Sequence, residues 1–129
     1  MKYYNNTVLN SDFESAIEQV TNSLKNEGFG VLTDIDIKAT LKNKLDVDFR
    51  KYRILGACNP PAAYKALSSE DKIGVFLPCN VIVQELEDGT IEIAAVDPVA
   101  SMMSVENDQL SEVATEIQTR LKRAIAALN

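Results

Sequence analysis

The Asp88-Gly89 step constrains the fold of this chain more than any other feature of its sequence. An Asp-Gly pair between two apolar runs rich in β-branched residues is typical of a β-hairpin. The first run covers residues 73–86 and is interrupted by Pro78, and the second covers residues 90–96. Because proline cannot donate to a central ladder, it predicts an edge, a bulge or a break in the first strand. The chain therefore contains at least one antiparallel pair of strands.

The register of this hairpin depends on the length of its loop. If the loop is the Asp-Gly pair alone, Val83 faces Ala94 and Val81 faces Val96. Side chains alternate between the two faces of a strand, so this register also decides which residues enter the core.

Capping residues mark the starts of two predicted helices. Ser11, as N-cap, and Glu14 have the spacing of a capping box, and Gly28 fits the left-handed position that ends the helix. Asn59 before Pro60 is a second N-cap, because proline is tolerated at the first helical position and disfavours helical geometry in the residue before it. We therefore expect one helix between Ser11 and Gly28 and another beginning at Pro60.

Period-two and helical patterns along the whole chain give the order βαβαβαββα. The predicted elements are strands over 2–9, 29–37, 50–58, 73–86 and 90–96, and helices from 11, over 38–45, from 60 and over about 108–128. We predict an α+β fold, a two-layer sandwich with helices packed on a mixed sheet of about five strands, in preference to a doubly wound α/β fold. The 129 residues, 46% of them hydrophobic, fit a single domain over 1–129, because no repeat or long linker interrupts them.

Charge and residue types exclude several classes of function. The net charge of −6 gives no reason to expect binding to nucleic acid or to an anionic membrane. No run approaches the roughly 20 apolar residues that span a bilayer. The chain has no histidine, which excludes Ser-His-Asp and Cys-His catalysis within one chain and histidine ligation of metals. Two cysteines without a secretory signal predict a cytoplasmic protein with reduced thiols.

Basic residues cluster between residues 38 and 53. This stretch holds six Lys or Arg residues and two Asp residues, in a chain whose net charge is −6. An anionic ligand, or an acidic face of a second subunit, would be attracted to it. The alternative is an ordinary solvated helix and loop.

The candidate site lies at two Cys-Asn steps, each beside a proline at a point where a strand pattern is disturbed. Cys58-Asn59 lies directly before Pro60, and Cys79-Asn80 directly follows a proline. If the two strands are neighbours, these four residues are candidates for the lining of one ligand pocket. The alternative is structural, because free cysteine is among the most buried residue types and Asn59 is itself a good cap.

The thiols are open to two kinds of chemistry. Cys58 precedes a predicted helix N-terminus, which favours the nucleophilic thiolate, so a redox reaction would use Cys58 as nucleophile and Cys79 as resolving partner. With the thioethers of Met102 and Met103, the thiols would offer soft ligands that suit Cu(I). The spacing matches no fixed metal motif, and methionines usually fill gaps in cores. We therefore assign no catalytic residue, no metal and no cofactor.

Three segments resemble the domain-of-unknown-function 302 family. They are Gly28–Asp36, Ile54–Pro60 and Leu77–Val81, and the likeness covers nearly the whole chain in the same order, including Asp97-Pro98 and Met102-Met103. The resemblance implies a small α+β domain, a homodimer, and no established activity.

The chain departs from the family pattern at one place. The family often carries glycine where this chain has Asp46, directly after Leu45. Because the position lies in a predicted loop, we expect the departure to leave the fold unchanged.

We rank three functions. The first is a non-catalytic binding module, a homodimer whose pocket near the two Cys-Asn segments takes a small organic ligand or a soft metal. The second is a structural or interaction protein in which Cys58 and Cys79 are core residues. The third is a thiol-dependent redox protein or enzyme that uses the same two residues, and it ranks last because no histidine is present to activate a thiol.

Overall fold

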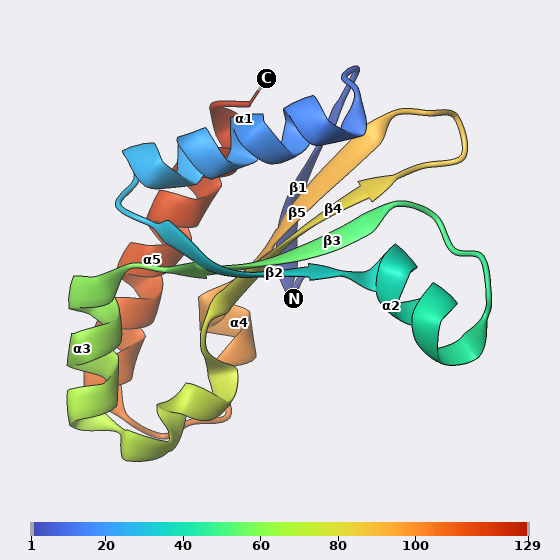
Figure 1. Ribbon diagram of the computed structural model, residues 1–129. Coiled ribbons are helices and arrows are strands. Elements are labelled where there is room, and N and C mark those ends of the chain that lie inside the picture. The colour runs from blue at the N-terminus through green and yellow to red at the C-terminus, as the bar shows by residue number, and fades with distance from the viewer. Residues whose placement is uncertain (1, 129) are drawn as a thin grey trace.

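In the computed structural model, which describes residues 2–128, helices pack on a five-stranded sheet (Figure 1). The elements are β1 (Tyr4–Leu9), α1 (Phe13–Asn26), β2 (Gly30–Asp36), α2 (Ile37–Leu45), β3 (Tyr52–Cys58), α3 (Pro60–Ser69), the 3₁₀ helix η1 (Asp71–Phe76), β4 (Cys79–Glu85), β5 (Ile91–Val96), α4 (Pro98–Ser101) and α5 (Asp108–Ala126). The predicted α+β two-layer fold with five strands is confirmed.

The sheet is antiparallel throughout, so the prediction of a mixed sheet is wrong. Its strand order is β1-β5-β4-β3-β2, and each neighbouring pair is antiparallel. The reason lies in the connection from β3 to β4. Helix α3 leads away from the sheet and η1 brings the chain back to the same end, so that Cys79 pairs with Ala57. A helix before a strand therefore does not imply a parallel crossover here.

Helix α1 begins one residue later than predicted. Asp12, not Ser11, is the N-cap, and its carboxylate accepts a hydrogen bond from the Ser15 amide at 2.9 Å. The carboxylate also accepts from the Ser15 hydroxyl at 2.8 Å, which gives Asp12 two bonds that Ser11 does not make. The predicted end is confirmed, because Gly28 has a φ of 86°.

The β4–β5 hairpin has a three-residue loop. The amide of Leu86 donates to the carbonyl of Thr90 at 2.8 Å, and Gly89 adopts the left-handed conformation with a φ of 86°. A type I turn followed by a left-handed glycine is a common hairpin of this length. Val83 therefore pairs with Ile93, and the register predicted for a two-residue loop is wrong by one position.

The predicted strand over residues 73–86 is two elements. Residues 71–76 form the 3₁₀ helix η1, and β4 begins at Cys79, directly after Pro78. The break predicted at Pro78 is therefore confirmed, but the apolar residues before it are not in the sheet. Ile73 in η1 is 1% exposed, and a buried helical turn of this kind has the same apolar composition as a buried strand.

Helices α1 and α5 cover one face of the sheet. Strand residues on this helix-covered face are almost fully buried: Leu55, Val81, Val83, Ile91 and Ile93. Helix α5 is 19 residues long and contributes Leu121 and Ala124 to the same core. Among residues 2–128, no helix is both long enough and apolar enough to cross a membrane.

The other face of the sheet, which we call the open face, carries the alternate residues of the strands. Its members are half-buried or exposed except for Gly56: Tyr4, Asn6, Val8, Thr33, Ile35, Tyr52, Ile54, Gly56, Asn80, Ile82, Gln84, Glu92, Ala94 and Val96. The sheet therefore has one face in the core and one that the helices leave uncovered.

Residues 37–51, which we call the arm, stand apart from the core. They comprise α2 and the segment leading to β3, and no residue of α2 is buried. Figure 1 shows α2 projecting from the end of the sheet, away from α1. Asp46 ends the helix with a φ of 52°, a left-handed conformation in which glycine carries no steric penalty. This explains why glycine suits the position at which the chain departs from the family pattern.

Candidate functional site: an apolar cavity beside two thiols

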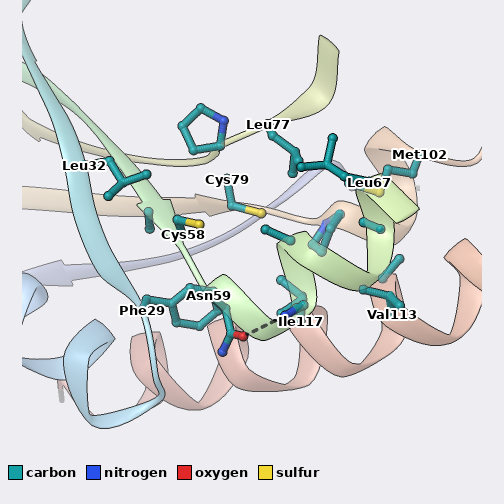
Figure 2. Close-up of a pocket in the computed structure, with 17 residues that line it drawn as sticks. Phe29, Leu32, Cys58, Asn59, Leu67, Leu77, Cys79, Met102, Val113 and Ile117 are labelled. Atoms are coloured by element: carbon teal, nitrogen blue, oxygen red, sulfur yellow. Dashed lines mark hydrogen bonds between the residues drawn. The ribbon is translucent and has the colours of Figure 1, made fainter. Parts of the chain in front are cut away.

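A cavity of about 290 Å³ lies where β3 ends and β4 begins, between that end of the sheet and helices α3 and α5 (Figure 2). Its walls are almost entirely apolar, with two thiols and one thioether among them. Protein interiors are normally packed with few voids larger than a water molecule. This cavity is not an interior void of that kind, because it opens to solvent beside Leu32 and Leu67, both of which are exposed.

Helix α3 forms one wall with small side chains. Ala62, Ala63 and Ala66 all line the cavity, and the space that larger residues would fill stays empty. The helix is held in position at its start by Asn59, whose side-chain oxygen accepts a hydrogen bond from the Ala62 amide at 3.1 Å. The predicted N-cap role of Asn59 is confirmed. Its side chain also lines the cavity, with its oxygen already engaged in the cap.

Helix α5 and the segment after α4 form the opposite wall. Val113, Ala114 and Ile117 face the cavity from α5, and Met102 faces it from the end of α4. These lining residues of α3 and α5 were not predicted as site residues. The only signal for them was the alanine-rich sequence of α3, which by itself indicates a helix and nothing more.

Asp97 holds α4 in position at this wall. It is 8% exposed, and its carboxylate caps α4 by accepting from the Val99 amide at 2.9 Å. The side-chain amide nitrogen of Gln118 in α5 donates hydrogen bonds to both carboxylate oxygens, at 3.0 and 2.9 Å. This buried carboxylate therefore has a structural role, because it ties α4 to α5 and fixes Met102 beside the cavity.

The two thiols meet at the cavity because β3 and β4 are neighbours. Cys58 ends β3 and is half-buried, whereas Cys79 begins β4 and is buried. Cys79 pairs with Ala57, so the two cysteines are one residue apart along the ladder. Figure 2 shows both sulfur atoms at the wall of the cavity. The sequence expectation that the cysteines converge if their strands are adjacent is thus met in the structure.

The Cys79 thiol is a weaker acid than an ordinary cysteine thiol. Burial raises the pKa of the Cys79 thiol to about 11, and the negative charge that Cys58 would carry as a thiolate adds to the shift. Cys79 is therefore a neutral thiol at pH 7, and its sulfur behaves as part of an apolar wall. A neutral thiol is a poor nucleophile and must lose its proton before it binds a metal.

Strands β2 and β3 and the residue before Cys79 come into close contact at Gly56. Gly56 of β3 lies under Thr33 and Pro78, and a Cβ built on it would overlap Thr33 Oγ1 and lie 2.7 Å from Pro78 Cγ. Only glycine leaves room for both neighbours. The Leu77–Pro78 peptide bond is cis, and both of these residues also line the cavity.

Two of the predicted site residues lie elsewhere. Asn80 is exposed on the open face, because consecutive residues of a strand point to opposite sides and Cys79 faces the core. Met103 is 69% exposed, while Met102 is buried at the cavity wall. The structure therefore brings Cys58, Asn59, Cys79 and Met102 together and leaves Asn80 and Met103 apart from them.

Metal ligands are sparse around the cavity. Within residues 2–128, no cluster of three or more His, Cys, Asp or Glu side chains has the geometry to hold a metal ion. The available donors are the sulfur atoms of Cys58, Cys79 and Met102, all of which line the cavity. Any metal held there would have to be one that prefers soft ligands.

Comparison with known proteins identifies a family and similar solved structures. Residues 5–128 match the family model described as "Domain of unknown function DUF302". The crystal structure of an uncharacterized conserved DUF302 protein from Bacillus stearothermophilus is similar, with 29% sequence identity, 100% of each chain covered and a TM-score of 0.92. No match is found among the curated proteins.

Proposed function

The chain belongs to the DUF302 family, and we propose that it is a non-catalytic binding module whose cavity takes a small apolar organic ligand. The observation that carries the proposal is the cavity of about 290 Å³ between α3, α5 and the sheet. Ligand sites are typically concave, mostly apolar and roughly 300–1,000 Å³ in volume, so this cavity lies at the small end of that range.

The chemistry of the walls indicates what the ligand is like. The side-chain oxygen of Asn59 already accepts a hydrogen bond from the Ala62 amide in the α3 cap, and Cys79 is a neutral thiol at pH 7. No charged side chain lines the cavity within residues 2–128. A ligand with a buried charge would lose its hydration without gaining a partner, which costs several kcal/mol. The walls therefore favour a neutral, compact and largely hydrocarbon ligand.

The test is to fill the cavity. We expect Ala63→Phe, which extends a half-buried α3 residue into the space, to weaken binding of the neutral fluorescent probe N-phenyl-1-naphthylamine about ten-fold or more. Ala126→Phe, on an exposed position of α5 away from the cavity, is the matched control and should bind the probe like the unaltered protein. Equal binding by Ala63→Phe and the control, or no binding by the unaltered protein, would contradict the proposal.

A soft metal is the second candidate ligand, supported by three sulfur side chains that line the cavity. Cu(I) would use Cys58, Cys79 and Met102, and its affinity would rise with pH because Cys79 has to lose a proton. Cu(I) titration against a competing chelator tests this. Cys58→Ser should weaken binding and Met103→Leu, at an exposed position, should not. Retention of Cu(I) affinity in Cys58→Ser would remove this candidate.

The other two functions have less support. A structural or interaction protein with core cysteines agrees with the burial of Cys79 but leaves the cavity unused. A thiol-dependent redox protein using Cys58 and Cys79 requires the second thiol to ionise, and its pKa of about 11 opposes that near neutral pH.

We also propose that the protein is a single-domain, cytoplasmic homodimer. The uncovered apolar residues of the open face support a dimer, and a similar protein aligned over 100% of both chains supports a single domain. The two free cysteines support a reducing compartment. Native mass spectrometry of the untagged protein at micromolar concentration tests the dimer. A mass equal to one chain across the concentration series would contradict it.

A further inference from the structure

The centre of the open face is apolar. Ile35 pairs with Ile54, Ile54 with Ile82, and Ile82 with Ala94, so that one row of apolar side chains crosses four neighbouring strands. An antiparallel sheet face that is exposed to water normally carries polar side chains at these alternate positions. The row therefore has the composition of a face that something covers.

The next row toward the arm is polar, but its groups are hydrogen-bonded to one another. Arg50 donates to the Gln84 oxygen at 2.8 Å, and Gln84 donates to one oxygen of Glu92 at 2.7 Å. Asn6 donates to the other oxygen of Glu92 at 2.9 Å. Polar groups that are already paired can be buried at lower cost than free ones. Tyr52, at the end of the same row, adds an aromatic ring of the kind that is enriched in interfaces.

Charges of opposite sign flank this row at one end of the sheet. The arm, on the side of β2 and β3, carries five basic residues and two acidic ones. Asp46 and Asp48 pair with Lys42 at 3.0 and 3.6 Å, and the other four cations are Lys38, Lys44, Arg50 and Lys51. The tip of the β4–β5 hairpin, residues 85–90, carries three acidic residues and no basic one. The Glu85 amide donates to the Lys51 carbonyl at 3.0 Å, so the arm and the hairpin lie at the same end, as Figure 1 also shows.

We propose that the open face is the interface with a second copy of this chain, related by a two-fold axis that runs parallel to the strands. The inference rests on the proposed homodimer and adds the surface and the geometry. In an isologous dimer the same patch on both subunits is self-complementary. An axis parallel to the strands places the charged end of one sheet over the charged end of the other. It also reverses the order of the strands in the second sheet relative to the first. The basic arm of each subunit therefore meets the acidic hairpin of the other.

The alternative axis lies across the strands and is disfavoured by charge. It would place the arm of each subunit over the far end of the other sheet, where the open face carries Thr33, Asn80 and Val96 and has no acidic group. The axis parallel to the strands instead lays Ile82 against Ile82 of the partner subunit. It also brings Arg50 near Glu92 of the partner subunit, which gives the glutamate a cation in addition to its two amide donors.

The area of the open face is compatible with a stable dimer. Five strands spaced about 4.8 Å apart give a face about 24 Å wide, and three outward residues per strand extend about 20 Å along it. That is roughly 500 Å² in projection, before the relief of the side chains and the arm are added. Standard interfaces bury about 800 Å² of accessible surface per partner, so the face and the arm together approach the required size.

The first experiment places a charge at the centre of the proposed interface. We expect Ile82→Arg to raise the dimer dissociation constant about 100-fold, measured by native mass spectrometry and analytical ultracentrifugation, because two like charges would face each other across the axis. Val75→Arg is the matched control, since Val75 is 82% exposed on η1 and far from the open face, and it should dimerise normally. Circular dichroism reports whether each variant is folded.

The second experiment tests the pairing across the axis. Arg50→Glu and Glu92→Lys each place two like-charge pairs in their own homodimer, so each should dimerise about ten-fold more weakly or worse. Mixing the two variants allows a heterodimer in which both pairs have opposite charges. We expect the heterodimer to exceed its statistical share in native mass spectra. This result cannot come from contacts within one chain, because neither variant carries both changes.

The outcomes separate this inference from the function that it rests on. A protein that is monomeric at all concentrations overturns the homodimer and its interface together, and leaves the cavity assay unaffected. A dimer that persists unchanged in Ile82→Arg overturns the open face as interface but keeps the homodimer. A statistical mixture of Arg50→Glu and Glu92→Lys overturns the axis parallel to the strands. If Ile82→Arg does not fold, the mixing experiment decides alone.

Discussion

The two faces of the sheet use similar residues for different purposes. Leu55 and Ile54 are consecutive in β3, yet Leu55 is 1% exposed beneath the helices and Ile54 is only half-buried on the open face. On the helix-covered face the strand residues meet α1 and α5, whereas these helices leave the open face uncovered. Hydrophobicity alone therefore does not distinguish a core position from a position on the open face in this protein; the position of the helices does.

The helix-covered face is itself uneven. Beneath α1 it is filled by Val81 and Val83, both fully buried. At the far end, beneath α3, the alanines of that helix leave the cavity. The two sides of the sheet therefore offer different surfaces: a small apolar cavity, open to solvent, on one side and a broad, flat face on the other.

The largest expected effect on stability comes from truncating neighbouring apolar residues on the two faces of the sheet. Leu55→Ala should lower the free energy of unfolding by about 2–5 kcal/mol, because it leaves a hole in a packed core. Ile54→Ala, its neighbour, should lower it by about 1 kcal/mol or less in the monomer. Urea denaturation measured at low protein concentration compares them. Equal losses would mean that the open face is packed as tightly as the core.

The next effect is a loss of stability at alkaline pH, which we expect from the ionisation of Cys79 on the helix-covered face. The Cys79 pKa is raised from 9.0 to about 11 in the folded protein, so the unfolded chain loses this proton first. The stabilisation is complete below about pH 9 and is lost as the pH rises toward 11. It amounts to roughly 2–3 kcal/mol. Urea denaturation across this range should show a smaller decline in Cys79→Ala than in the unaltered protein.

The control for the alkaline effect is the second thiol. Cys58→Ala keeps Cys79 buried, so most of the decline between pH 9 and 11 should remain. If both alanine variants flatten the profile equally, burial of Cys79 is not its main cause.

A smaller effect on stability is expected at Gly56, a buried position of the open face. Gly56→Ala should destabilise the protein by about 1–3 kcal/mol, because the new methyl group would overlap Thr33 Oγ1 and Pro78 Cγ. Thermal denaturation measures the change. The matched control is Gly30→Ala, since a Cβ at Gly30 has no neighbour within 4 Å. A loss at Gly30 as large as that at Gly56 would contradict the steric explanation.

The smallest effect compares two helix caps. Asn59→Ala should cost about 1 kcal/mol of global stability, because α3 packs on α5 and its first turn borders the cavity. Asp36→Ala removes the equivalent bond to the Ala39 amide in α2, but no residue of that helix is buried. Hydrogen exchange should therefore show local opening of the arm, with global unfolding little changed. A global loss from Asp36→Ala would show that the arm is part of the core.

Local signals in the sequence were sufficient where the physics is local. The Asn59-Pro60 cap, the left-handed Gly28 and the break at Pro78 were all predicted and all confirmed, because each depends on backbone geometry within a few residues. The N-cap of α1 was placed at Ser11 instead of Asp12 because adjacent residues both offered a suitable oxygen. Such an error moves a boundary by one residue and leaves the fold intact.

Errors with larger consequences arose where two segments must be placed against each other. The register of the β4–β5 hairpin depended on whether the loop has two or three residues, and Gly89 suits both. The sheet was expected to be mixed because a helix between two strands often makes a parallel crossover. The return of the chain through η1, which was predicted to be part of a strand, made it antiparallel.

The residues of the candidate site were likewise predicted only in part. Sequence reasoning selected Cys58, Asn59 and Cys79, and the adjacency of β3 and β4 brings them together at the cavity. It also selected Asn80, which the period of two places on the opposite face. The residues that leave the space empty, Ala62 and Ala66, carry no chemical signal, because an alanine becomes a cavity wall only when its neighbours fail to fill the gap.

The sequence by itself determined the elements, their caps and their order, because these follow from hydrogen bonds and apolar spacing within a few residues of the chain. Only the tertiary structure decided which apolar side chains are core, which line the cavity and which remain on the open face. The physical reason is that a side chain is buried only where a second surface packs against the one that carries it. Leu55 and Ile54 are equally apolar in the sequence, and they differ because α1 and α5 pack against one side of the sheet and leave the other side uncovered.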